Sequence, residues 1–146
     1  MKSHARHSLK LMLLAALATS PIASRAEGNG ELFHQFGEKA GLTKTTNDFV
    51  SELLVDPRTE RFFAKTDLAR LREKLYEQFC EALDGPCKYT GRKMAEVHDG
   101  LEIKAADFNS LVEDLQKAMR KNHVPERAQN KLLAKLAPMH RDVIEK

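Results

Sequence analysis

The stretch from Phe62 to His98 constrains the fold of this chain more than any other part of the sequence. It begins with an aromatic pair, and in residues 68–83 apolar side chains then recur every three or four positions. That spacing predicts an amphipathic helix with one apolar side. A glycine-proline turn follows, and the short segment 92–98 ends on the histidine. This order of segments predicts a flat apolar space between the helix and the histidine, with the two phenylalanines at the edge of that space.

Apolar residues recur at the same spacing in three further segments, which cover residues 43–55, 105–121 and 125–144. Each predicts an amphipathic helix, although Pro138 is expected to kink or shorten the last one. No alternation of apolar and polar residues indicates a strand, so the chain predicts an all-α domain. The expected core comprises Phe49, Leu53, Leu115, Leu132 and Leu136.

Polar residues suggest where two of these helices begin. Thr45 or Thr46 stands where it could cap the first helix, and Thr66 or Asp67 stands before the central helix. Such side chains accept hydrogen bonds from the free backbone N–H groups of a first helical turn. Pro57 is expected to end the first helix.

The first 26 residues have the three-part layout of a secretory signal peptide. A basic start precedes the apolar run 11–18, and Ser24 and Ala26 suit cleavage before Glu27. The apolar run is shorter than the roughly 20 residues that a membrane span needs. We therefore expect residues 1–26 to be removed and residues 27–146 to form one exported, periplasmic domain without a membrane span. An uncleaved anchor is the alternative.

Without residues 1–26, the net charge of the chain does not favour a nucleic-acid partner. The whole chain has 24 basic and 21 acidic residues. Four basic residues and no acidic one lie in residues 1–26, which leaves 20 basic and 21 acidic residues and a net charge of −1. A nucleic-acid-binding domain needs clustered cations in excess, so we expect no such partner.

Two cysteines, Cys80 and Cys87, flank the glycine-proline turn. In an oxidising compartment they can form a disulfide, which would stabilise the fold by about 2–3 kcal/mol. The sequence does not fix the distance between their Cα atoms, so a disulfide and two separate thiols are both open.

His98 is the histidine whose neighbours suit a metal ligand. A neutral imidazole that binds iron needs an apolar, sterically defined slot. Met94 and Val97 precede it on the same short segment, and Phe108 enters from the next helix. Alone, a histidine at a helix end is more often a cap or a surface residue. The other histidines after residue 26 lack such neighbours and are expected on the surface: His34, His123 and His140.

A set of residues along the chain matches the pattern of one known family: Asp48-Phe49-Val50, Asp56-Pro57-Arg58, Phe62-Phe63, Thr66-Asp67-Leu68, Gly85-Pro86, Tyr89-Thr90-Gly91, Met94, His98, Phe108 and Val124-Pro125. Over residues 31–143 the chain resembles a group 1 truncated haemoglobin. The resemblance implies a globin-like two-over-two helical sandwich around a b-type haem. It also implies that His98 is the proximal ligand of the iron and that Phe63 packs on the haem face.

The resemblance and the helical spacing together predict a haem-binding set. Its members are Phe63, Leu71, Lys74, Leu75, Phe79, Met94, Val97, His98 and Phe108, with His98 and Lys74 as the candidate iron ligands. No Cys-x-x-Cys-His motif occurs in the chain, so we expect the haem to be held without covalent links.

The side of the haem opposite His98 is expected to be apolar. Relatives that hold oxygen tightly usually have a tyrosine at the position of Val50 and often a donor at the position of Leu75, and Leu71 is apolar too. Bound oxygen carries partial negative charge and gains from a hydrogen-bond donor. Losing such a bond would weaken binding by roughly 1.5–3 kcal/mol, so stable oxygen storage is not expected.

Lys74 has two open interpretations. It lies three residues after Leu71, where some relatives have a residue that coordinates the iron. A lysine can do so only as the neutral amine. The alternative is that Lys74 extends outward and pairs with a haem propionate. Gln78, seven residues after Leu71, has two open positions, inward or on the surface, and the surface is favoured.

These observations favour a haem protein that binds a small diatomic ligand, oxygen or nitric oxide, with a redox or nitric-oxide-detoxifying role. Nitric oxide dioxygenase or weak peroxidase activity would require an electron donor, which the sequence does not identify. Two alternatives are open. One is an electron-transfer protein with Lys74 as the sixth ligand, and the other is a secreted helical module that binds a protein and has no cofactor.

Overall fold

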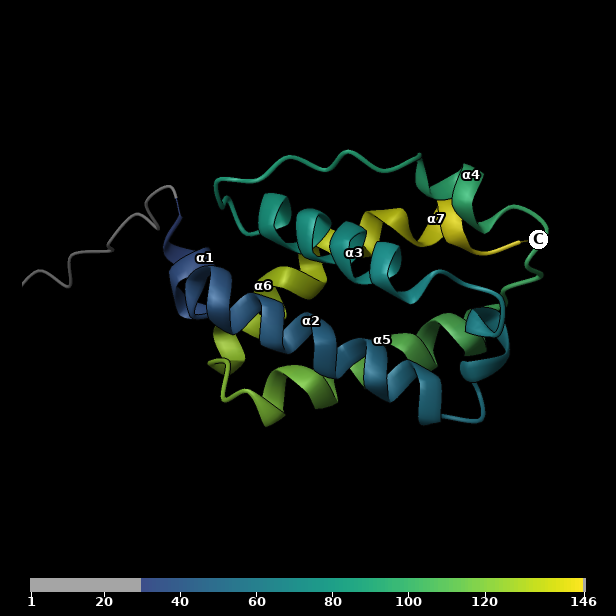
Figure 1. The fold of residues 1–146 in the computed structure, drawn as a ribbon, viewed down its shortest axis with the longest axis horizontal. Helices are drawn as coiled ribbons and strands as arrows, with labels where there is room; N and C mark the ends of the chain where they lie inside the picture. The colour runs from purple at the N-terminus through teal and green to yellow at the C-terminus, as the bar shows by residue number, and fades with distance from the viewer. Residues whose placement is uncertain (1–29, 146) are drawn as a thin grey trace, which may run out of the picture.

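The computed structural model describes residues 30–145, and the predicted signal segment 1–26 lies outside them. Within these residues the chain is helical and contains no strand (Figure 1). The longer helices are α2 (Glu38–Val55), α3 (Leu68–Ala82), α5 (Ala105–Lys121) and α6 (Glu126–Leu136). The short ones are α1 (Glu31–Gln35), η1 (Glu60–Phe63), α4 (Met94–His98), η2 (Ala137–Met139) and α7 (His140–Val143). The predicted all-α class is confirmed.

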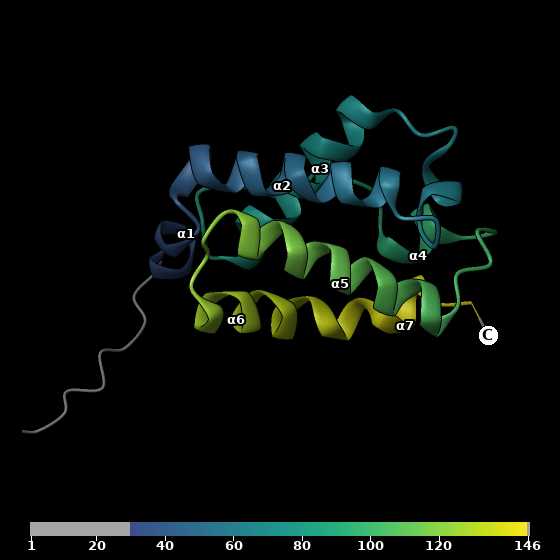
Figure 2. The same ribbon diagram turned by 90° about the horizontal axis from the view of Figure 1, so that it is seen from below.

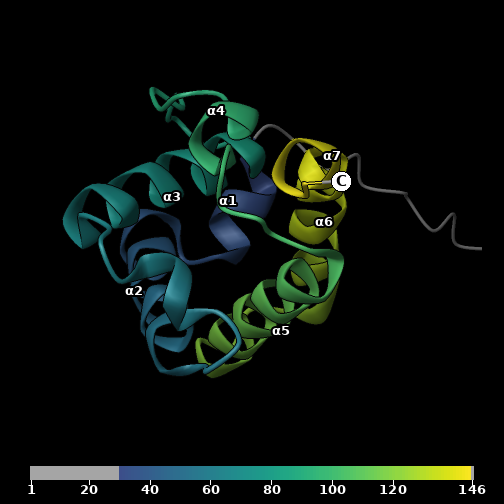
Figure 3. The same cartoon turned by 90° about the vertical axis from the view of Figure 1, so that its right-hand side faces the viewer.

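The four longer helices form two layers. α2 packs on α3 in one layer and α5 packs on α6 in the other, while α2 packs on α5 and α3 contacts α6 between the layers. Figures 2 and 3 show this arrangement from below and from the end of the molecule. α4 packs on α7 and stands apart from the two layers (Figure 1). No helix within residues 30–145 is long and apolar enough to cross a membrane.

The start of α2 differs from the sequence prediction. The helix begins at Glu38, and Gly37 precedes it with a φ of 75°. Glycine adopts this left-handed conformation without a side-chain clash. Thr45 and Thr46 therefore lie inside the helix and are buried, so the prediction that one of them caps it was wrong.

The central helix agrees with the prediction at both ends. Oδ1 of Asp67 accepts hydrogen bonds from the backbone N–H groups of Ala69 (3.0 Å) and Arg70 (3.1 Å), so Asp67 is the cap. α3 ends at Ala82, close to the expected end at residue 83.

A disulfide joins Cys80, near the end of α3, to Cys87, and their Cα atoms lie 5.7 Å apart. A Cβ on Gly85 would lie 2.8 Å from Sγ of Cys80, so the turn approaches the disulfide more closely than a residue with a side chain allows. The structure thus contains the bond that the sequence left open.

The core contains the aromatic and aliphatic side chains of both layers. Phe49, Leu53, Leu115 and Leu132 are buried as predicted, whereas Leu136 is only half-buried. Leu136 is the last residue of α6, because the chain continues through the 3-10 turn η2 around Pro138. The expected shortening of this helix is confirmed.

Candidate functional site

The apolar side chains of α3 and α5 are buried to different degrees along each helix. On α3, Phe79 is buried, but Leu71 and Leu75 are only half-buried. On α5, Leu115 is buried, while Phe108 is only half-buried. The first turns of both helices lie at the end of the molecule that carries α4 (Figure 1). Partly exposed apolar side chains of both helices therefore lie at the same end of the molecule. This arrangement suits an apolar group inserted between the helices.

α4 carries His98 at its last position, and the side chain is half-buried. Nδ1 of His98 lies 2.8 Å from the backbone carbonyl oxygen of Met94, one turn earlier. A carbonyl oxygen only accepts hydrogen bonds, so Nδ1 is the protonated nitrogen that donates. In the neutral imidazole the lone pair then lies on Nε2, which can bind a metal, as in many metal-binding histidines.

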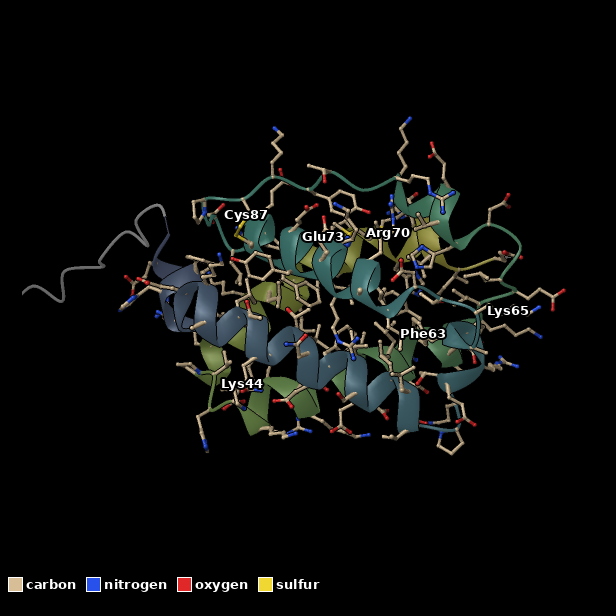
Figure 4. The ribbon with its side chains drawn as sticks, viewed as in Figure 1. Lys44, Phe63, Lys65, Arg70, Glu73 and Cys87 are labelled. Atoms are coloured by element: carbon tan, nitrogen blue, oxygen red, sulfur yellow. A yellow bond between two sulfur atoms is a disulfide. The ribbon has the colours of Figure 1, made fainter. Side chains whose placement is uncertain are left out.

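Two phenylalanines border the same region. Phe63, on η1, is half-buried and packs against the core near the first turn of α3 (Figure 4). Phe108, near the start of α5, meets the ring of His140 edge-on, with 4.8 Å between the ring centroids. His140, like His34 and His123, is exposed as expected. The aromatic side chains predicted for the site are thus near its walls.

Phe79 lies deeper than the rest of the predicted set. Its side chain is 2% exposed, and its ring centroid lies 5.9 Å from that of Phe49 in the core. The half-buried members lie on η1, α3, α4 and α5; they are Phe63, Leu71, Lys74, Leu75, Met94, Val97, His98 and Phe108. Phe79 therefore contributes mainly to the core between α2 and α3.

Lys74 is engaged by carboxylates and a hydroxyl. Its Nζ lies 2.8 Å from Oε1 of Glu73, 2.9 Å from Oε1 of Glu77 and 2.7 Å from Oγ1 of Thr90. The hydrogen bonds to Glu73 and Glu77 raise the pKa of Lys74, so the amine is a cation in this arrangement. A cationic amine has no lone pair for iron. To coordinate the iron, Lys74 would have to leave these partners and lose its proton.

Glu77 connects α3 to the segment before α4. The backbone N–H and the hydroxyl of Thr90 both donate to Oε2 of Glu77, at 2.9 and 2.8 Å. These bonds and Lys74 lower the pKa of Glu77 to about 2. Together with the Cys80–Cys87 disulfide, they attach the segment that leads to α4 to the side of α3 (Figure 4 shows Cys87).

Gln78 takes the less favoured of its two predicted positions. The surface was favoured, but the side chain is half-buried. Its Nε2 lies 3.3 Å from the sulfur of Met94 on α4 and 3.3 Å from the sulfur of Met139 in η2. The side chain therefore extends from α3 towards the helix that carries His98. The three-to-four spacing on α3 puts residue 78 two turns after Leu71 and one turn after Lys74, and this spacing is the signal for an inward position.

A separate hollow of about 600 Å³ opens between η1 and the start of α5. Phe62, Lys65, Leu101 and Lys104 are among its lining residues. None of the predicted haem-binding residues lines it. It is therefore distinct from the half-covered walls of α3 and α5.

The residues at the site fit a flat apolar group that contains a metal. Half-buried aliphatic and aromatic side chains line it, and the Nδ1 contact of His98 leaves Nε2 of the neutral imidazole to act as a ligand. A porphyrin needs such an apolar surface, and its iron needs one nitrogen ligand. An all-α sandwich with an imidazole at the edge of an incompletely covered apolar region has the character of a globin.

Comparison with known proteins agrees with this class. Residues 31–145 match the family model described as bacterial-like globin. A group 1 truncated haemoglobin from Mycolicibacterium paratuberculosis is 31% identical over 108 residues, covering 74% of this chain and 79% of the relative. One from Synechocystis is 30% identical over 99 residues, 65% of this chain and 80% of the relative.

Solved structures show the same fold. The Fe(III) form of the truncated haemoglobin from Tetrahymena pyriformis superposes with a TM-score of 0.75 at 22% identity, over 79% of this chain and 98% of the other. The 2/2 haemoglobin of Synechococcus, in the cyanomet state with covalently attached haem, gives a TM-score of 0.73 at 21% identity, over 79% and 98% of the two chains.

The chain belongs to the bacterial-like globin family, and its relatives identify it there as a group 1 truncated haemoglobin. Membership of this family implies that it binds haem. The predicted two-over-two globin-like fold is confirmed.

Proposed function

We propose that this chain binds one haem b without covalent links, between α3 and α4, with His98 as an axial ligand of the iron. The half-buried side chains of α3, α4 and α5 cover the porphyrin. The haem supplies an iron that binds a small diatomic ligand, oxygen or nitric oxide. The absence of a Cys-x-x-Cys-His motif from the sequence supports the non-covalent mode.

The hydrogen bond from Nδ1 of His98 to the carbonyl oxygen of Met94 carries this proposal. It fixes the tautomer and the ring orientation, which makes Nε2 a better electron donor. A surface histidine or a helix cap would not need apolar neighbours. Here Met94, Val97 and His98 are all half-buried at the same end of the molecule as the half-covered walls.

The proposal is tested by titrating the purified protein with haemin and recording the visible spectrum. We expect one haemin per chain and the spectrum of an iron with a nitrogen ligand. A protein that stays colourless would instead be a helical protein-binding module without a cofactor, and the proposed function would be wrong.

We further propose that the domain is exported and works in the periplasm. The layout of residues 1–26 supports export, and so does the Cys80–Cys87 disulfide, because such bonds persist in oxidising compartments. A redox or nitric-oxide-detoxifying role is favoured over oxygen storage by the apolar Val50, Leu71 and Leu75. Turnover of nitric oxide with a reductase as electron donor would test that role.

The Val50→Tyr variant is expected to slow oxygen dissociation about ten- to a hundredfold, because a phenol hydroxyl would donate a hydrogen bond to the partly negative ligand. Val50 is fully buried on α2, so the larger side chain also strains the core. Val50→Phe adds nearly the same volume without the hydroxyl and is the matched control. Equal dissociation rates in the two variants would contradict the proposed position of Val50 beside the ligand.

We propose that Lys74 stays on its carboxylate partners and does not coordinate the iron. Two carboxylates and a hydroxyl hold its amine within 2.9 Å. The ferric spectrum of the Lys74→Ala variant is therefore expected to match that of the unmodified protein. A change from a six-coordinate, low-spin spectrum to a five-coordinate one would instead show that Lys74 is the sixth ligand and would favour the electron-transfer role.

A further inference from the structure

Gln78 is a polar side chain on the wall of the site whose hydrogen-bonding capacity is largely unused. Within residues 30–145, its amide nitrogen meets only two thioether sulfurs, those of Met94 and Met139. A thioether is a weak acceptor, and a half-buried amide without a strong partner is unfavourable. The amide therefore has two N–H donors available to a stronger acceptor in this region.

The other side chains that are expected to lie opposite His98 do not offer such a donor. Val50, Leu71 and Leu75 are apolar. Lys74 is committed to Glu73, Glu77 and Thr90. Gln78 follows Lys74 by one turn on α3, and its amide reaches towards α4, the helix that ends on His98.

We propose that Gln78 donates the hydrogen bond that stabilises a diatomic ligand on the haem. This inference rests on the proposed function, because the acceptor is the partly negative outer atom of that ligand. Bound oxygen is a stronger acceptor than either thioether, so the amide leaves Met94 and Met139 at little cost and donates to the ligand. Gln78 thus supplies a polar contact in a pocket that Val50, Leu71 and Leu75 are expected to make apolar.

The test is the Gln78→Met variant, which keeps the length and approximate volume of the side chain and removes both donors. We expect the C–O stretching frequency of the ferrous carbon monoxide complex to rise, because the positive N–H group no longer polarises the ligand. We also expect oxygen to dissociate about ten- to a hundredfold faster, the effect of losing one hydrogen bond to a charged acceptor.

Two further variants separate this role from a structural one. Gln78→His retains a donor and is expected to recover part of the shift in frequency. Gln35→Met removes an amide from α1, outside the proposed site, and is expected to change neither quantity. The haem-free Gln78→Met protein is expected to unfold at an unchanged or higher temperature, since an apolar side chain replaces a poorly bonded amide.

The outcomes distinguish the inference from the proposed function. If the unmodified protein does not bind haemin, both are wrong. If it binds haemin and carbon monoxide, and Gln78→Met leaves the C–O frequency and the oxygen dissociation rate unchanged, the role of Gln78 alone is overturned. A rise in frequency that Gln78→His does not reduce would also contradict a role as donor.

Discussion

The His98→Ala variant is expected to bind haemin at least about a hundredfold more weakly than the unmodified protein and to lose the spectral bands of an axial imidazole. Removing even the hydrogen-bond partner of a metal-binding histidine typically weakens metal affinity about ten- to a hundredfold, and this substitution removes the ligand itself. Half-buried apolar side chains would still contact the porphyrin, so residual binding is expected. A haemin titration followed by visible absorption measures both effects.

Added imidazole provides the control for this variant. A small imidazole can enter the space left by the side chain and is expected to restore the axial bands. His34→Ala removes an exposed histidine on α1 and is expected to leave the titration unchanged. A His98→Ala protein with the spectrum and affinity of the unmodified protein would show that another residue binds the iron.

The Cys80→Ser/Cys87→Ser double variant is expected to be about 2–3 kcal/mol less stable than the disulfide-bonded protein. The disulfide closes a short loop, with a sequence separation of 7, and the chain-entropy model gives about this loss for such a loop. The backbone and side-chain bonds of Thr90 to Glu77 continue to hold the next part of the segment. Urea unfolding of the haem-free proteins at equal pH measures the difference.

A reductant supplies an independent check on the disulfide. It is expected to lower the unfolding midpoint of the unmodified protein to that of the double variant and to have no effect on the double variant itself. Equal midpoints of the oxidised protein and the double variant would contradict a stabilising role. The comparison is made without haem because a reductant also reduces the iron.

Local sequence signals predicted the helices that depend on local interactions. α5 has the predicted bounds, 105–121, because its apolar spacing is unbroken along its length. α3 begins where Asp67 caps it, because an aspartate before a periodic segment accepts the free N–H groups of the first turn. The sequence did not reveal that α2 begins at Glu38, because the helix follows Gly37 in a left-handed conformation instead of a polar cap.

The site was predicted less completely because its features depend on tertiary packing. Periodicity predicts that Leu75 and Phe79 lie on one side of α3. It does not predict that Leu75 is half-buried and Phe79 is buried, because this difference depends on α2 lying against the second half of α3. The orientation of Gln78 depends on Met94 and Met139, which come from α4 and η2. The partners of Lys74 include Thr90, 16 residues away. None of these contacts follows from spacing along one helix.

The most direct test of the account is a nuclear magnetic resonance spectrum of the haem-bound protein in its ferric, cyanide-ligated form. Cyanide would occupy the other ligand position of the iron, so among the protein's signals the paramagnetic iron would most strongly shift those of the ligand residue and the groups beside it. We expect strongly shifted imidazole ring signals assigned to His98, including an Nδ1–H protected from exchange by the carbonyl oxygen of Met94. Shifted signals assigned to a different residue, with those of His98 in their ordinary range, would contradict the account.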